Sequence, residues 1–302
     1  MNIGRVLIIL GAALVSALNE PAIASERLNL YPREPRLGEI SFVSLDNYAP
    51  AKGETVSVRL LDRDFPLHPD GKGGLEGFIA VERDAKAGVH TLTLKSSRSG
   101  DDKTVYTDKI KVAARKFVEQ HLTVDEKMVK LSPEDEERAA RERVLINKAL
   151  GARSGGDPAA EWYERPVPGQ VSSTFGMRRF YNGRPGSYHG GLDIAAPRGE
   201  PVKASGEGAV VLTGDFFFTG NSVFVDHGGG LITAYFHMDE LGVKGGAHVK
   251  EGDVIGRVGS TGRSTGPHLH WSVYLCGVKV DPESLLVAVA GRGRQAARPG
   301  GN

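Results

Sequence analysis

The chain has 302 residues, enough for about two domains at roughly 100–200 residues each, and its 40% hydrophobic and 25% charged residues are typical of a globular protein. This composition excludes wholesale disorder and a protein with many membrane spans. Lys and Arg total 38 against 37 Asp and Glu, so the basic excess that supports nucleic-acid binding is missing and we expect no nucleic-acid partner. The single cysteine, Cys276, excludes an intrachain disulfide and a zinc site built from several cysteines.

The first 24 residues have the pattern of a secretory signal peptide. Arg5 supplies the positive charge, Val6 to Leu18 form a 13-residue apolar stretch, and Ala22-Ile23-Ala24 is a small-x-small cleavage site. The alternative is an uncleaved membrane anchor, for which this stretch is short, because a bilayer requires about 20 apolar residues. We therefore expect cleavage after residue 24, a periplasmic or secreted protein, and no stable membrane insertion after cleavage.

Residues 25–113 have the alternation of half-buried strands. Val56, Val58 and Leu60 alternate with polar residues, and turn signals such as Asp70-Gly71 separate the alternating runs. Short strands at this spacing predict a mainly β domain of the immunoglobulin-like sandwich type. We see no catalytic grouping in this part of the chain.

Residues 114–165 are predicted to form a charged helical connector. Half of the residues from 115 to 144 are charged, and Ser132-Pro133-Glu134 is typical of a helix start. Residues 166–288 are predicted to form a second β domain, because 23 of the 40 glycines lie between Gly169 and Gly277, which favours short strands and tight turns. Residues 289–302, rich in Gly, Ala, Arg and Pro, are expected to be a disordered tail.

Histidines concentrate in the second domain, where six of the nine lie between His189 and His270. His189 and Asp193 form an HxxxD pattern, and His268 and His270 form an HxH pattern. The residues from 268 to 275 alternate, so a strand would bury one set and point both imidazoles to the other face.

A similar alternation runs from residue 231 to 238. It places His237 on the same polar face as Thr233 and Tyr235, opposite an apolar set. Two strands that present histidines on polar faces are difficult to explain by core packing alone.

A divalent zinc ion suits this residue set, because catalytic zinc sites use three nitrogen or oxygen ligands and keep one position for water. A bound water can then reach a pKa near 7 and act as a nucleophile at neutral pH. His189, Asp193 and one histidine of the HxH pattern would supply the ligands. The remaining histidines would serve proton transfer or stabilise an oxyanion.

Four separated segments now make a resemblance specific. They are Phe175-Gly176-Met177-Arg178-Arg179, His189-Gly190-Gly191-Leu192-Asp193-Ile194-Ala195-Ala196-Pro197, Tyr235-Phe236-His237 and Ser264-Thr265-Gly266-Pro267-His268-Leu269-His270-Trp271. In order and spacing the chain resembles the LytM/lysostaphin-type zinc endopeptidases over about residues 166–287. The resemblance implies one Zn²⁺ ion, with the ligands His189, Asp193 and His270 and the catalytic histidines His237 and His268. It also implies a mostly antiparallel β peptidase domain with an open groove, acting on the peptides of peptidoglycan.

Two other functions stay open beside an active zinc endopeptidase. One is a non-catalytic wall regulator that activates other hydrolases, as relatives without metal ligands do; the presence of all five site residues argues against it. The other is a phosphohistidine carrier, which the export signal opposes. Besides peptidoglycan we consider a cell-envelope regulatory protein as a partner, and we expect the N-terminal domain to position the enzyme or to shield its groove.

A serine hydrolase is a weaker reading of the same region. The segment from Gly262 to Gly266 matches GxSxG, but Pro267 and a strand pattern follow it, where a nucleophile elbow requires a helix.

Overall fold

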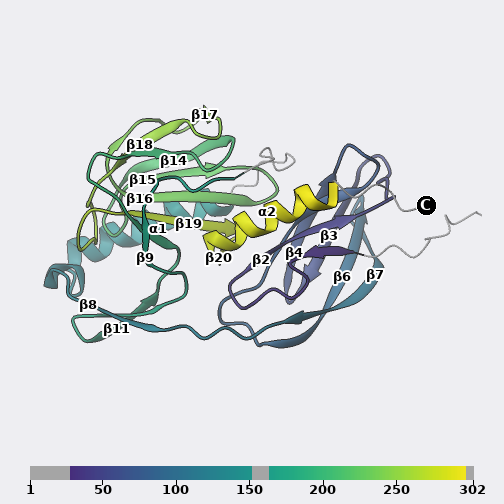
Figure 1. The fold of residues 1–302 in the computed structure, drawn as a ribbon, viewed down its shortest axis with the longest axis horizontal. Coiled ribbons are helices and arrows are strands. Elements are labelled where there is room, and N and C mark those ends of the chain that lie inside the picture. The colour runs from purple at the N-terminus through teal and green to yellow at the C-terminus, as the bar shows by residue number, and fades with distance from the viewer. Residues whose placement is uncertain (1–27, 152–162, 297–302) are drawn as a thin grey trace, which may run out of the picture.

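The computed structural model describes residues 28–151 and 163–296, and the expected signal peptide at residues 1–24 lies outside these ranges. Two β-rich halves lie side by side, with the C-terminal helix α2 (Pro282–Ala296) packed between their sheets (Figure 1). No helix within the described ranges combines the length and the apolar character that a membrane crossing needs.

The N-terminal half is one antiparallel sheet of seven strands in the order β1-β2-β5-β4-β3-β6-β7. Its strands are β1 (Asn29–Tyr31), β2 (Ile40–Leu45), β3 (Glu54–Leu60), β4 (Arg63–Pro69), β5 (Leu75–Ala80), β6 (Gly88–Arg98) and β7 (Asp101–Val112). Val56, Val58 and Leu60 on β3 are buried as their alternation predicted. The mainly β prediction is confirmed. The immunoglobulin-like detail is not, because the strands pair in a single continuous order.

The connector holds more than a helix. It contains β8 (Glu119–Leu122), the 3₁₀ helix η1 (Glu126–Met128) and α1 (Pro133–Gly151). The helix begins as the sequence predicted, with the Asp135 amide donating to Ser132 Oγ at 3.1 Å. One side of this charged helix is covered, since Ile146 and Leu150 of α1 pack against an aromatic cluster of the C-terminal half. Strand β8 pairs with β10 of that half, so the connector is integrated into it.

The C-terminal half is built on a ten-stranded sheet whose main path runs β17-β14-β15-β16-β19-β12-β9. Its strands are β9 (Gln170–Ser173), β12 (Leu192–Ala195), β13 (Pro201–Lys203), β14 (Gly208–Phe216), β15 (Gly220–Asp226), β16 (Leu231–Leu241), β17 (His248–Val249), β18 (Val254–Val258), β19 (Leu269–Leu275) and β20 (Val278–Val280). A small sheet of β11 (Arg184–Tyr188), β10 (Arg178–Tyr181) and β8 lies beside it. Fully buried Trp271 and Tyr235 face each other across β19 and β16 and occupy the core.

The expected disordered tail is wrong over residues 289–296, which belong to helix α2. Leu285, Ala288 and Val289 are spaced for one helix face and are buried. A Cβ at Gly291 would lie 1.9 Å from the Tyr31 ring, so this glycine permits close packing on the N-terminal sheet. Gly291 therefore belongs to a packed contact, whereas the sequence pattern had indicated a disordered tail.

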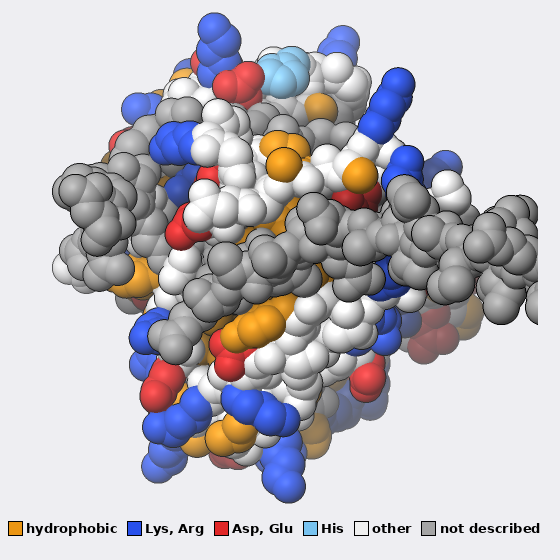
Figure 2. Space-filling model, turned by 90° about the vertical axis from the view of Figure 1, so that its right-hand side faces the viewer, with side chains coloured by type: hydrophobic (Ala, Val, Ile, Leu, Met, Phe, Trp, Pro, Cys, Tyr) orange, Lys and Arg blue, Asp and Glu red, His pale blue; other side chains and the backbone are white. Residues whose placement is uncertain are grey.

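Polar contacts fix the N-terminal sheet to the C-terminal half. The Asp281 amide donates to the Gly38 carbonyl at 2.7 Å, and the Asp281 carboxylate pairs with Arg115 at 2.7 Å. The Ile40 amide donates to Ser284 Oγ at 3.2 Å. At the outer end of the N-terminal sheet, basic and acidic side chains are interspersed around the face (Figure 2).

His227 is a buried histidine that belongs to none of the predicted site motifs. Its Nδ1 lies 2.6 Å from the Glu207 carbonyl and its Nε2 lies 2.8 Å from Thr233 Oγ1. Burial lowers the pKa of His227 to about 4. The ring therefore stays neutral in the folded protein at pH values where an exposed histidine is protonated.

This pKa predicts acid sensitivity of the fold. Protonation favours the unfolded chain as the pH falls from about 6.5 to about 4, so the free energy of unfolding should drop by about 3 kcal/mol over that range from His227 alone. In urea unfolding with a chelator present, His227→Gln should show a shallower pH slope than the wild type, and the exposed-site variant His248→Gln should not. Equal slopes for His227→Gln and the wild type would contradict this assignment.

Candidate functional site

The site is built on a row of residues that crosses neighbouring strands. Strand register places Asp193 of β12 directly opposite His270 of β19, and His270 opposite Phe236 of β16. Residues opposite each other in a sheet share a face, so the three side chains lie together. Leu269 and Trp271 point into the core from the other face, as the HxH alternation predicted.

His189 reaches this row from the loop that precedes β12. Its amide donates to the Met177 carbonyl and its carbonyl accepts from the Gly176 amide, both at 2.8 Å. A Cβ on Gly191 would lie 2.4 Å from the Trp271 carbonyl oxygen and 2.6 Å from His270 Nε2. The loop therefore passes directly against β19, and glycine is needed there to bring His189 to the site.

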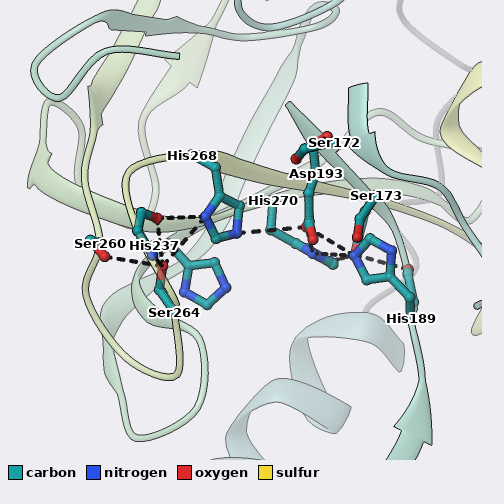
Figure 3. A network of polar contacts seen from close by, with 12 residues as sticks. Ser172, Ser173, His189, Asp193, His237, Ser260, Ser264, His268 and His270 are labelled. Carbon is teal, nitrogen blue, oxygen red and sulfur yellow. Dashed lines mark hydrogen bonds and ion pairs between the residues drawn. The ribbon is translucent and has the colours of Figure 1, made fainter. Parts of the chain in front are cut away.

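The structure brings the three predicted ligands to one point (Figure 3). His189 Nε2 lies 2.9 Å from Asp193 Oδ1 and 3.0 Å from His270 Nδ1, and the latter two atoms are 2.7 Å apart. All three residues are buried. Two imidazole nitrogens and one carboxylate oxygen are a donor set that suits zinc.

The other ring nitrogens of the two histidines are held by the protein. His189 Nδ1 donates to the Thr174 carbonyl at 2.7 Å, and His270 Nε2 lies 2.8 Å from Ser272 Oγ. Ser272 Oγ in turn donates to the Gly190 carbonyl at 3.0 Å. These contacts turn His189 Nε2 and His270 Nδ1 inward, as second contacts of metal-binding histidines commonly do. The residues therefore fit a bound metal ion.

The protonation states of Asp193 and His270 also suit a bound metal ion. Burial alone would raise the pKa of Asp193, but the hydrogen bonds with His189 and His270 outweigh it and hold the pKa well below its usual range. Burial lowers the pKa of His270 to about 4 against the opposing effect of Asp193. At neutral pH the site thus offers an ionised carboxylate and a neutral His270, the forms that bind metals.

The two remaining predicted residues, His237 and His268, lie beside this cluster. Their ring centroids are 5.0 Å apart, and His268 Nε2 lies 3.7 Å from Asp193 Oδ1. His237 Nδ1 donates to the Thr261 carbonyl and His268 Nδ1 to the Gly266 carbonyl, each at 2.8 Å. A carbonyl only accepts, so each Nδ1 carries the proton and each neutral ring keeps an accepting Nε2. Burial, then the charges of His268 and His270, lower the pKa of His237 to about 3.

The strand face predicted for His237 is wrong. In a regular strand Tyr235 and Met238 would point to opposite faces, but both belong to the same core cluster. The backbone turns between them at His237, whose φ is 63°, and the pairing of β16 with β18 shifts register beside it. His237 is thereby separated from the Tyr235 face, and its ring lies 6.0 Å from that of His270. A bulge of this kind re-aims one side chain without ending the strand.

Sequence reasoning missed two residues behind Asp193. Arg179 Nη2 contacts Asp193 Oδ2 at 2.6 Å, and Arg179 Nε donates to Gln120 Oε1 at 2.9 Å. Arg179 stood in a quoted motif but received no role. Gln120 lies on β8, outside the predicted peptidase domain, and nothing in its local sequence marks it.

A groove opens along this site. Its lining contains Asp193, His237 and His268, residues 263–267 of the loop before β19, and Gln120, Leu122 and Val124 from the connector. No described residue from 28 to 113 lines it. The connector, and not the N-terminal sheet, therefore forms part of the groove wall.

The cluster predicts metal binding that depends on its three residues. The wild type should bind about one zinc ion per chain and unfold at a higher temperature with zinc, because only the folded chain presents the site. His270→Ala and Asp193→Ala should lose most of the bound zinc in elemental analysis, whereas His248→Ala should retain it. Retention of zinc at wild-type affinity by Asp193→Ala would sink the assignment.

The contact between Arg179 and Asp193 predicts that removing the Arg179 guanidinium weakens zinc binding without abolishing it. Arg179→Met should weaken zinc affinity by about ten- to a hundredfold, since residues that orient a ligand commonly contribute that much. Competition with a chromogenic chelator measures it. Arg178→Met on the same strand is the matched control, because Arg178 is exposed and does not contact the cluster; equal affinity in both variants would rule out the role of Arg179.

Residues 187–282 match the model of Peptidase family M23. The chain is 42% identical over 118 residues to the DD-carboxypeptidase/endopeptidase Mpg of Neisseria meningitidis, covering 39% of this chain and 27% of that protein. It is 39% identical over 139 residues to the peptidoglycan DD-endopeptidase ShyA of Vibrio cholerae, covering 45% of this chain and 32% of that protein. The chain thus spans less than a third of the length of these curated relatives.

The likeness to a solved structure extends over both halves of the chain. A Pseudomonas aeruginosa protein assigned provisionally to peptidase M23 superposes with a TM-score of 0.65 at 29% identity, covering 84% of this chain and 96% of that one. The family match, the relatives and this structure agree with the resemblance drawn from the sequence motifs. Residues 187–282 of the C-terminal half therefore form a Peptidase family M23 domain.

Proposed function

We propose that this protein is an exported, zinc-dependent endopeptidase that cleaves cross-links or stem peptides of peptidoglycan. The proposal is carried by the convergence of donor atoms from His189, Asp193 and His270, which lie within 3.0 Å of one another. Asp193 also lines the groove, together with His237 and His268. The names of the Neisseria and Vibrio relatives support the substrate class. The signal-peptide pattern at residues 1–24 supports a periplasmic or secreted location.

One Zn²⁺ ion would be held by His189, Asp193 and His270. When bound, it supplies a Lewis acid that activates water and polarises the peptide carbonyl. The protein keeps Asp193 ionised through its hydrogen bonds and its Arg179 contact, and it fixes both histidine rings through Thr174 and Ser272. Zinc ligands held in this way need little rearrangement on metal binding.

His237 and His268 are assigned together to proton transfer and to stabilising the charge on the carbonyl oxygen. Each has its Nδ1–H fixed on a backbone carbonyl, which leaves Nε2 of the neutral ring free to accept a proton. Once protonated, an Nε2–H can donate to the oxygen or to the leaving amine. Both residues line the groove, where a peptide would lie.

The N-terminal sheet is proposed to hold the enzyme on the wall or on a cell-envelope regulatory protein. It is fixed to the C-terminal half through α2 and Asp281 and lines no part of the groove in the described residues. This arrangement favours positioning over shielding. The alternative of a non-catalytic regulator is supported less, because all five residues of the site are present.

The assignment predicts a split between catalysis and metal binding. His237→Ala and His268→Ala should each lower kcat for cross-linked muropeptides by about a hundredfold or more while keeping their zinc, because neither residue is a ligand in this scheme. Mass analysis of the fragments measures cleavage, and His248→Ala serves as the control.

Two outcomes would decide against an active enzyme. If the zinc-loaded wild type released no fragments yet stimulated another wall hydrolase, the regulator would be the better function. If His268→Ala cleaved as fast as the wild type, the catalytic role of that histidine would fail.

A further inference from the structure

Arg263 is held in place by three separate parts of the chain. Its guanidinium carbon lies 4.1 Å from the centroid of the Tyr181 ring and 4.5 Å from that of Phe218. Its Nη1 donates to the Met128 carbonyl at 3.4 Å, and its backbone amide donates to the Phe218 carbonyl at 2.9 Å. Such stacking orients a planar guanidinium and limits its rotation.

This cation has no acidic partner among the described residues. Arg179 also lines this groove, but its guanidinium is already paired with the Asp193 carboxylate. Arg263 is half-buried, and burial lowers the pKa of its guanidinium. A partly desolvated arginine without a counter-ion favours the binding of an anion.

The position of Arg263 places that anion near the reacting groups. Arg263 lines the groove together with His237, His268 and Asp193. It follows Thr261 by two residues, and the Thr261 carbonyl accepts the hydrogen bond of His237 Nδ1. The loop that orients one catalytic histidine therefore also carries the unpaired cation.

We propose that Arg263 binds a free carboxylate on the leaving-group side of the scissile peptide bond. The proposal rests on the proposed peptidase function and assigns to Arg263 the selection of peptides in which the carbon bonded to the scissile nitrogen also bears a free carboxylate. A D-Ala cross-link to diaminopimelate has this chemistry, and so does a D-Ala-D-Ala terminus. An internal glycine bridge does not, because its carboxyl groups are all in amide bonds.

The planar fork of arginine suits this ligand. A guanidinium can donate two parallel hydrogen bonds to one carboxylate, whereas a carboxamide accepts only through its single oxygen and carries no charge. The groove would therefore distinguish an acid from its amide at this position. Lysine at position 263 would keep the charge and lose the fork and much of the stacking.

The test uses two cross-linked stem peptides that differ only in one group: the diaminopimelate carboxylate beside the scissile nitrogen is free in one and amidated in the other. We expect the zinc-loaded full chain to favour the acid by about ten- to a hundredfold in kcat/KM. Arg263→Gln should bring this ratio close to one by slowing cleavage of the acid alone. Arg263→Lys should be intermediate, and Arg257→Gln, an exposed arginine on β18, should keep the wild-type ratio.

Binding of the same two peptides, measured by calorimetry to the zinc-loaded His268→Ala chain, separates this proposal from the proposed function. Tighter binding of the acid with no hydrolysis of either peptide by the wild type would support the subsite and refute the peptidase. Equal binding and equal cleavage of acid and amide would refute the subsite and leave the peptidase standing. An equal loss on both peptides in Arg263→Gln, with an unchanged melting temperature, would also refute it, since Arg263 would then only shape the loop.

Discussion

The pairing of β12 with β19 is the constraint on which the site depends. Because side chains alternate with a period of two, the register that sets Asp193 opposite His270 also buries Leu269 and Trp271 on the other face. A slip of one residue would point His270 into the core and Trp271 into the groove. Burial of apolar side chains, worth roughly 1.5–3 kcal/mol each, therefore holds Asp193 and His270, the proposed metal ligands, together before any metal is present.

A second, local constraint is the break in the regular alternation of β16 at His237. The residues before His237 on β16 alternate as an ordinary strand, and a positive φ at His237 breaks the alternation where the strand meets the groove. A non-glycine residue in this region of φ costs about 1–3 kcal/mol and persists only where its surroundings hold it. Here the Thr261 carbonyl fixes the imidazole and the buried Met238 fixes the chain beyond it. The backbone strain is therefore located at His237, the residue whose imidazole has to be aimed at the site.

Alternation was sufficient to predict the mainly β fold and the shared face of His268 and His270, and the family resemblance of the motifs implied the set of five residues that the structure brings together. They failed where a contact lies far away in sequence. The bulge at His237 depends on Thr261, the helix at residues 289–296 depends on a close approach of Tyr31 to Gly291, and strand β8 depends on a partner more than fifty residues away. Periodicity measures which face a residue prefers, and it contains no information on which distant segment will cover that face.

The connector shows how such distant contacts extend the site beyond the matched family domain. Gln120 of β8 holds Arg179, and Arg179 holds the outer oxygen of Asp193, while the carbonyl of Met128 in η1 holds Arg263. One short segment thus supports both Asp193, a proposed metal ligand, and Arg263 of the groove. Residues 113–118 join this segment to β7 of the N-terminal sheet, and α2 packs on β1 and β2 of that sheet (Figure 1). Asp193 and Arg263 are therefore supported by the segment that joins the two halves, while the N-terminal sheet lines no part of the groove in the described residues.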